Sequence, residues 1–207
     1  MCSSRWNRRS WKVRSANPLK AANWARVTGL ARLEDVSPDG KVVLYTKGAF
    51  ASEVFSVRLD GTPDERVPRP VLQNDEWVWN TRFSPDGRWI VYQVAVAGQQ
   101  SGIYVQRFPG PGLRKQVTSS GEYPVWRKDG KEIVYLDGNR IWSLPVDTSS
   151  GEFNPGTPVP LFSVRRVGGV LDVSHLAISR DGSRIYFPQA VEQPDSDVIH
   201  IRTGWAR

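Results

Sequence analysis

The sequence TRFSPDGRWIVYQ, from Thr81 to Gln93, decides the fold of this chain. Its central tetrapeptide SPDG, at positions 84–87, predicts a type I turn, because proline has the φ angle needed at the second position and glycine is favoured at the fourth. The segment from Trp89 to Tyr92 is apolar, β-branched or aromatic, and too short for a helix. We therefore expect a strand, a tight turn and a second strand that is buried on both faces.

The turn and its second strand recur four times along the chain. The four units are VSPDGKVVLY (36–45), FSPDGRWIVY (83–92), WRKDGKEIVY (126–135) and ISRDGSRIYF (178–187). Each has an Asp-Gly pair in the turn, namely Asp39 and Gly40, Asp86 and Gly87, Asp129 and Gly130, and Asp181 and Gly182. Successive pairs are 47, 43 and 52 residues apart. A period of about 40 to 50 residues is typical of repeats that each form a four-stranded propeller blade.

Two further strands are predicted in the repeats. The third strand follows the turn aspartate by 12 to 17 residues and alternates apolar with polar residues, at 54–59, 103–108, 141–146 and 198–203. Weaker candidates for a fourth strand are 65–72, 114–119 and 157–164. Prolines in the first and last of these suit an outer edge strand, because proline cannot donate to a ladder.

These patterns predict an all-β fold, a β-propeller of about four blades that forms a partial or small ring. A sheet with two apolar faces cannot stand alone in water, and stacking such sheets about an axis buries both faces. We expect the propeller domain to span 29–207, with repeat units of about 29–73, 74–119, 120–164 and 165–207. Residues 1–28 are expected to form a basic, poorly ordered leader. An incomplete ring would expose apolar end faces, so self-association is expected in that case.

The basic charge is concentrated near the start of the chain. Of 28 basic and 21 acidic residues, eight basic and no acidic residues lie within 1–33, which leaves 20 basic against 21 acidic in the rest. This balance argues against nucleic-acid binding by the propeller body. It keeps open one alternative function, the binding of nucleic acid or another anionic surface by the leader.

No segment has the pattern of a membrane span or a signal peptide. The sequence has no run of 18 or more apolar residues, and its basic first 30 residues include no apolar block. We therefore expect neither element in this chain. Cys2 is the only cysteine, so cysteine usage does not indicate a redox compartment.

The polar residues give no catalytic, metal or cofactor prediction. The four turn aspartates are each next to glycine, where a carboxylate caps local backbone N–H groups, so we interpret them as structural. The two histidines, His175 and His200, lie beside or within predicted strands, and no Gly-x-Ser-x-Gly elbow is present. We therefore expect no enzymatic activity, no metal and no cofactor.

The connection from an outer strand to the next inner strand is the best candidate for a recognition surface. These connections open on one rim of a propeller, and loops on a rigid scaffold often carry function. In this sequence they contain polar and aromatic side chains, and the predicted binding residues are Trp77, Trp79, Glu122, Tyr123, Asp172 and His175.

The repeats resemble the WD-type repeats of TolB β-propellers. The resemblance rests on FSPDGRWIVYQ, WRKDGKEIVYL and ISRDGSRIYFP, and it covers about residues 33 to 205. The run from Phe83 to Val164 also resembles the propeller at the C-terminus of many bacterial serine/threonine protein kinases. This resemblance implies a periplasmic or extracytoplasmic location. TolB-like propellers commonly have six or more blades, and the kinase signatures themselves are absent from this sequence.

Taken together, the sequence predicts a non-catalytic binding or sensor module of a bacterial signalling protein, with a protein or peptide as its partner. An alternative is that the chain is the propeller part of a hydrolase or peptidase, because TolB-like propellers also precede peptidase domains. The fold alone does not choose between these functions.

Overall fold

The strand, turn and strand predicted for each repeat are present in all four. The computed structural model describes residues 11–14, 24–27, 31–47, 53–73, 76–95, 100–110, 112–165 and 176–187. Within these ranges the regular structure is β-strand, apart from one 3₁₀ turn at Pro63–Arg66. No helix in the described ranges is long and apolar enough to cross a membrane.

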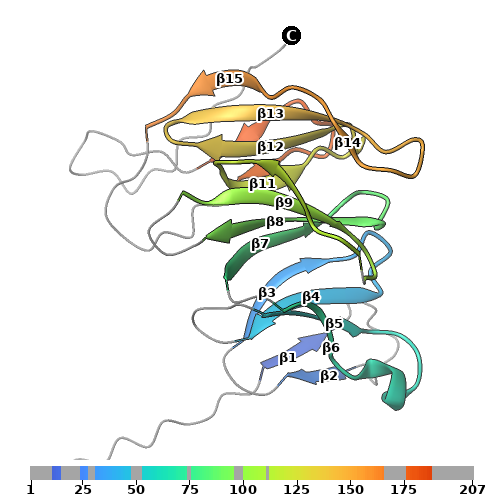
Figure 1. Ribbon diagram of the computed structural model, residues 1–207. Coiled ribbons are helices and arrows are strands. Elements are labelled where there is room, and N and C mark those ends of the chain that lie inside the picture. The colour runs from blue at the N-terminus through green and yellow to red at the C-terminus, as the bar shows by residue number, and fades with distance from the viewer. Residues whose placement is uncertain are drawn as a thin grey trace, which may run out of the picture. The chain divides into compact units, whose positions relative to one another are not determined.

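The first repeat forms a four-stranded antiparallel sheet (Figure 1). Its strands are β3 (Ala31–Val36), β4 (Val42–Lys47), β5 (Glu53–Arg58) and β6 (Arg69–Gln73), and each pairs with the next along the chain. One face carries a cluster of Val43, Tyr45, Val57 and Leu59. The Tyr45 ring stacks on Phe55 with 5.6 Å between centroids, which is a favoured separation for an aromatic pair across two strands.

The second repeat forms a similar sheet, in which the central strand is the most buried. Its strands are β7 (Trp77–Phe83), β8 (Trp89–Ala95), β9 (Gly102–Arg107) and β10 (Lys115–Thr118). Every residue of β8 from Trp89 to Val94 is buried. The prediction of a strand without a solvent-facing side is therefore confirmed.

The third repeat adds one short strand to the same plan. It consists of β11 (Glu122–Trp126), β12 (Glu132–Asp137), β13 (Arg140–Asp147) and β15 (Val159–Ser163), with β14 (Asn154–Pro155) pairing with the end of β13. The fourth repeat is described only at its turn, where β16 (Ala177–Ile178) pairs with β17 (Ile185–Tyr186). These antiparallel sheets of four or five strands confirm the all-β prediction.

Strand β12 shows why neighbouring sheets must stack. Ile133 and Tyr135 pack in a cluster that includes Trp89 and Val91 of β8, whereas Val134 packs in a cluster that includes Ile185 of β17. Alternate residues of a strand point to opposite faces, so β12 supplies the core on both of its sides. Each face of the third sheet is therefore buried by a neighbouring repeat.

The chain divides into two compact units, Met1–Trp79 and Asn80–Arg207. The first contains the sheet β3 to β6, and the second contains the packed sheets of the later repeats. The repeat boundaries expected from the sequence remain predictions.

Three local features differ from the sequence-based expectations. In the first repeat, Pro63–Arg66 forms a 3₁₀ turn, so the fourth strand begins at Arg69 and not at Glu65. The turn forms because proline is favoured at the first helical position and the Glu65 carboxylate accepts a hydrogen bond from the Thr62 N–H at 2.7 Å. Strand β14 was not expected, because the Gly- and Ser-rich segment around it has the composition of a loop.

The third difference lies within the expected leader. There β1 (Trp11–Arg14) and β2 (Trp24–Val27) pair as a two-stranded antiparallel sheet. The third strand expected at 198–203 lies outside the described residues.

Truncation of Ile133 should destabilise the second unit strongly. This side chain is fully buried between the second and third sheets, so Ile133→Ala is expected to lower the free energy of unfolding by about 2 to 5 kcal/mol. Arg140→Ala, an exposed position on the adjacent strand, is the control and should change it by less than about 0.5 kcal/mol. Equal effects in urea denaturation would contradict the packing described here.

Candidate functional site

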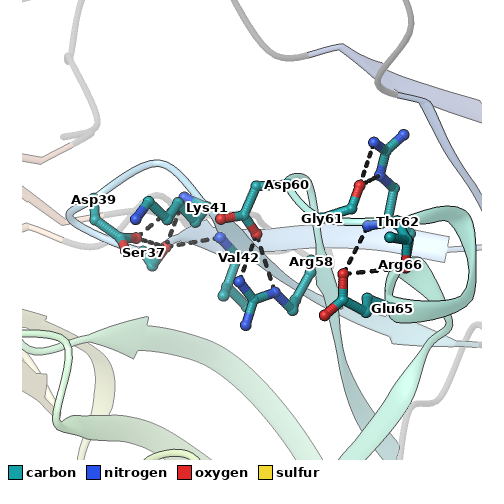
Figure 2. Close-up of polar contacts among 10 residues, drawn as sticks. All are labelled: Ser37, Asp39, Lys41, Val42, Arg58, Asp60, Gly61, Thr62, Glu65 and Arg66. Atoms are coloured by element: carbon teal, nitrogen blue, oxygen red, sulfur yellow. Dashed lines mark hydrogen bonds and ion pairs between the residues drawn. The ribbon is translucent and has the colours of Figure 1, made fainter.

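The turn aspartates bind the chain's own backbone. Figure 2 shows the first turn, where the Ser37 hydroxyl donates to the Asp39 carboxylate at 2.6 Å and accepts from the Val42 N–H at 2.8 Å. The same carboxylate accepts from the Lys41 N–H at 3.1 Å. The glycine that closes this turn has a φ of 71°, a conformation that other residues adopt at a cost. The polar atoms of the turn are thus paired locally.

The turns of the second and fourth repeats have the same arrangement, and the turn of the third repeat has a modified one. Ser84 donates to Asp86 at 2.5 Å, and Ser179 donates to Asp181 at 2.6 Å. In the third repeat the serine is replaced by Arg127, which pairs with Glu132 at 3.0 Å and with Asp129 at 3.5 Å. An Arg side chain thus takes the position that a hydroxyl has in the other turns. No group of three or more potential metal ligands occurs in the described part of the chain.

Hydrogen bonding lowers the pKa of two of these carboxyl groups, Asp181 and Asp39. The Ser179 hydroxyl, followed by the Ser183 N–H, lowers the pKa of Asp181 from 3.8 to about 2. The Ser37 hydroxyl and the Lys41 N–H likewise lower the pKa of Asp39. Both carboxylates are accordingly ionised at neutral pH and serve as fixed acceptors for backbone N–H groups.

Replacing Ser179 should raise the pKa of Asp181 towards 3.8. In the wild type, a folded-state pKa below the unfolded value means that this group stabilises the fold above about pH 4, and that the contribution disappears as pH falls towards 2. Ser179→Ala should remove much of that acid sensitivity. Carboxyl carbon shifts in an NMR titration measure the pKa, and Asp86 serves as the internal reference. An unchanged Asp181 pKa in the variant would contradict the assigned hydrogen bond.

The predicted rim residues begin the inner strands of their repeats. Trp77 and Trp79 lie at the start of β7 with their rings 5.9 Å apart, and Trp77 keeps 39% of its surface exposed. Glu122 and Tyr123 begin β11 and are half-buried. Asp172 and His175 lie outside the described residues, as does His200.

A buried amide links two of these inner strands within the second unit. The Gln93 side-chain oxygen accepts from the Asn80 side-chain amide at 3.0 Å and from the Tyr123 N–H at 3.2 Å. The Gln93 amide nitrogen donates to Ser101 at 3.1 Å. Gln93 is only 3% exposed, so its polar atoms need these partners. The link joins β7 and β8 of one repeat to β11 of the next.

Asn80 and Tyr123 occupy equivalent positions and share an uncommon backbone conformation. Each lies six residues before its turn aspartate, and their φ angles are 54° and 55°. Left-handed conformations at residues other than glycine cost energy and are retained where surrounding contacts enforce them. The sequence analysis named Tyr123 as a rim residue but missed Asn80 and the equivalence of the two, since only the constant offset from the Asp-Gly turn marks it.

Replacing Gln93 with leucine, a side chain of similar size, should lower the free energy of unfolding. Gln93→Leu removes the acceptor for both Asn80 and Tyr123, and an unsatisfied buried donor costs about 1 to 3 kcal/mol. The free energy of unfolding should fall by at least that amount in urea denaturation. Gln100→Leu, at an exposed position, is the control. A neutral effect of the Gln93 change would show that the amide is not a structural link.

A pocket of about 410 Å³ lies at the turn end of the second and third sheets. The second turn contributes Ser84, Pro85, Asp86 and Arg88, and the third turn contributes Asp129, Gly130 and Lys131. The last residue of β13 and the two residues after it contribute Asp147, Thr148 and Ser149. The remaining lining comes from Trp126 and Val146. Glu122 and Trp126 are the two ends of β11, so in the third sheet this pocket is at the opposite end from the predicted rim. The sequence analysis did not predict it.

No family model matches the sequence, and no curated protein matches it. Solved structures do match. A putative TolB from Agrobacterium tumefaciens is 24% identical over 79% of this chain and 55% of its own, with a TM-score of 0.60. TolB from Acinetobacter baumannii is 20% identical over 81% of this chain and 39% of its own, with a TM-score of 0.58. The fold is that of a TolB-type β-propeller. The sequence-based prediction of this fold is confirmed.

The TolB-type fold also corrects one expectation. An oligogalacturonate lyase in complex with manganese matches with a TM-score of 0.55, at 17% identity over 79% of this chain and 45% of its own. The expectation that the chain is not an enzyme is therefore wrong. It was drawn from the predicted propeller fold and from the small number of histidines, and an enzyme has the same fold. The chain spans about half the length, or less, of the structures that it matches. These comparisons do not show the resemblance to kinase-attached propellers.

Proposed function

We propose that this TolB-type propeller is a recognition module that binds a protein or peptide through the start of its inner strands. The observation that carries the proposal is the tryptophan pair at the start of β7. Trp77 is 39% exposed, and its ring lies 5.9 Å from that of Trp79. Tryptophan is enriched among the residues that dominate binding energy at interfaces, because its large rigid surface loses little entropy on contact.

The corresponding place in the third repeat supports the same function. Tyr123 is half-buried and Glu122 precedes it, so this strand also begins with an aromatic and a charged side chain. The backbone at Tyr123 is anchored by its hydrogen bond to Gln93. A side chain on an anchored backbone is preorganised, which reduces the entropy lost on binding.

We further propose that the module belongs to a bacterial signalling protein and works outside the cytoplasm. The support is the sequence resemblance of the run from Phe83 to Val164 to propellers attached to bacterial kinases. Binding of a partner to such a module would transmit a signal to an attached domain. Detection of the native protein in a periplasmic or an extracellular fraction tests the location, and recovery only from the cytoplasm would contradict it.

Truncation of the tryptophans should abolish most of the peptide affinity. Peptides selected from a random display library on the full chain provide the probe, and calorimetry gives their dissociation constants. Trp77→Ala and Trp79→Ala are each expected to weaken binding by about thirtyfold or more, as expected when a residue contributes 2 kcal/mol at an interface. Leu113→Ala is the control, because Leu113 is an equally apolar and still more exposed residue that lies before β10.

The outcomes of this experiment are distinct. Loss of affinity in the tryptophan variants, with retention in the Leu113 variant, supports the proposed surface. Failure to select any peptide above background, or equal affinity in all variants, would contradict it. Far-ultraviolet circular dichroism of each variant checks that the sheets are intact.

A further inference from the structure

We propose that the pocket at the turn end of the second and third sheets binds a neutral, polyhydroxylated ligand such as a mono- or disaccharide. The pocket lies within the second unit and does not involve the tryptophan pair, so this proposal does not rest on the proposed function. It is argued from the shape, the charges and the unpaired polar groups of the lining.

The pocket has the size and layering of a small-molecule site. Its volume of about 410 Å³ falls within the range of roughly 300 to 1,000 Å³ that is usual for ligand pockets. Pro85, Trp126 and Val146 supply apolar lining, and Trp126 and Val146 are each only 7% exposed. The turn residues Asp86, Arg88, Asp129 and Lys131 are exposed. A buried apolar part with exposed polar groups matches a ligand that has both carbon-bound hydrogens and hydroxyl groups.

The charges of the lining favour a ligand without net charge. Three carboxylates, from Asp86, Asp129 and Asp147, lie in the same pocket as the cations of Arg88 and Lys131. A cationic ligand would be repelled by the two cations, and an anionic ligand would be repelled by the three carboxylates. Asp86 and Arg88 already form an ion pair at 2.7 Å. A neutral ligand avoids both repulsions and leaves that pair intact.

Lys131 and Asp147 are the charged groups that still lack an opposite charge. In the described part of the chain, no carboxylate forms an ion pair with the Lys131 ammonium group, and no cation forms one with Asp147. Asp147 accepts hydrogen bonds from the Ser149 hydroxyl and from the Ser149 N–H, the latter at 2.9 Å. Hydrogen bonding from Ser149 lowers the pKa of Asp147, so the carboxylate is ionised. The pocket thus offers both a strong donor and a strong acceptor.

A hydroxyl group satisfies both of these requirements. It donates to a carboxylate and accepts from an ammonium group, and a polyol carries several such groups on one apolar frame. The hydroxyl-bearing side chains of Thr148 and Ser149 extend the same pattern along the lining. No group of three potential metal ligands occurs in the described ranges, which disfavours a metal ion as the occupant.

Trp126 forms part of the buried, apolar lining of the pocket. Its indole N–H is buried and has no hydrogen-bond partner among the described residues, although Trp126 lines the pocket. Buried donors are nearly always paired, and an unpaired one destabilises the protein. Because the nitrogen itself is buried, the pocket does not expose it to a ligand, and Trp126 supplies apolar lining only.

Calorimetry with the full chain tests the proposal. The probes are glucose, galactose, mannose and a disaccharide of each, with glucuronate and glucosamine as charged analogues. Lys131→Met and Asp147→Asn should each weaken the binding of a neutral sugar by about tenfold or more, as expected for the loss of a hydrogen bond to a charged group. Lys128→Met is the matched control, because Lys128 is exposed in the same turn and does not line the pocket. Trp77→Ala should leave sugar binding unchanged.

Each outcome decides the proposal. Binding of a neutral sugar that is weakened in the Lys131 and Asp147 variants, but not in the Lys128 variant, supports it. No binding by any neutral sugar, tighter binding of a charged analogue, or binding that is unaffected by either variant overturns it. If Asp147→Asn fails to fold, the Lys131 variant decides alone, since the hydrogen bonds of that turn use the Lys131 backbone and not its side chain.

Discussion

The structure depends on strands that have no solvent-facing side. In the third sheet, Ile133 and Tyr135 pack towards the second repeat while Val134 and Leu136 pack in the cluster shared with the fourth. A sheet of this kind is stable in water only when another sheet covers each face, since every uncovered apolar side chain forfeits about 1.5 to 3 kcal/mol of hydrophobic stabilisation. Stacking is therefore the condition under which these sheets exist.

The same stacking creates different chemistry at the two ends of the sheets in the second unit. At the turn end, carboxylates are held by local hydrogen bonds, and the ends of two sheets leave a pocket between them. At the other end, a buried amide joins consecutive inner strands through Asn80 and Tyr123. Both ends are placed by the rigid sheets between them, which is the usual way in which a scaffold positions recognition groups.

The propeller fold leaves the chemistry of the chain open. TolB proteins and a manganese-containing lyase share this fold at low identity, so the scaffold does not separate binding from catalysis. Particular side chains must carry any functional argument. Here those are the exposed Trp77 with its half-buried neighbour Trp79. The others are the oppositely charged Lys131 and Asp147, which line one pocket.

The sequence by itself determined the repeats, the turns and the central strands of the blades. It could do so because these features are local: Ser-Pro-Asp-Gly specifies a turn within four residues, and a continuous apolar run such as Trp89 to Tyr92 specifies a strand buried on both sides. The short strand β14 and the 3₁₀ turn at Pro63–Arg66 were missed, because weak local preferences there were decided by pairing and by a single carboxylate.

Only the tertiary structure decided which distant residues meet. Gln93 and Tyr123 are 30 residues apart and share a hydrogen bond, and the pocket combines two turns and a third segment. No periodicity in the sequence encodes such contacts, because they depend on how one sheet lies on the next. The repeated sequence pattern thus determines the strands of each sheet, and the packing between repeats determines which residues form the candidate sites.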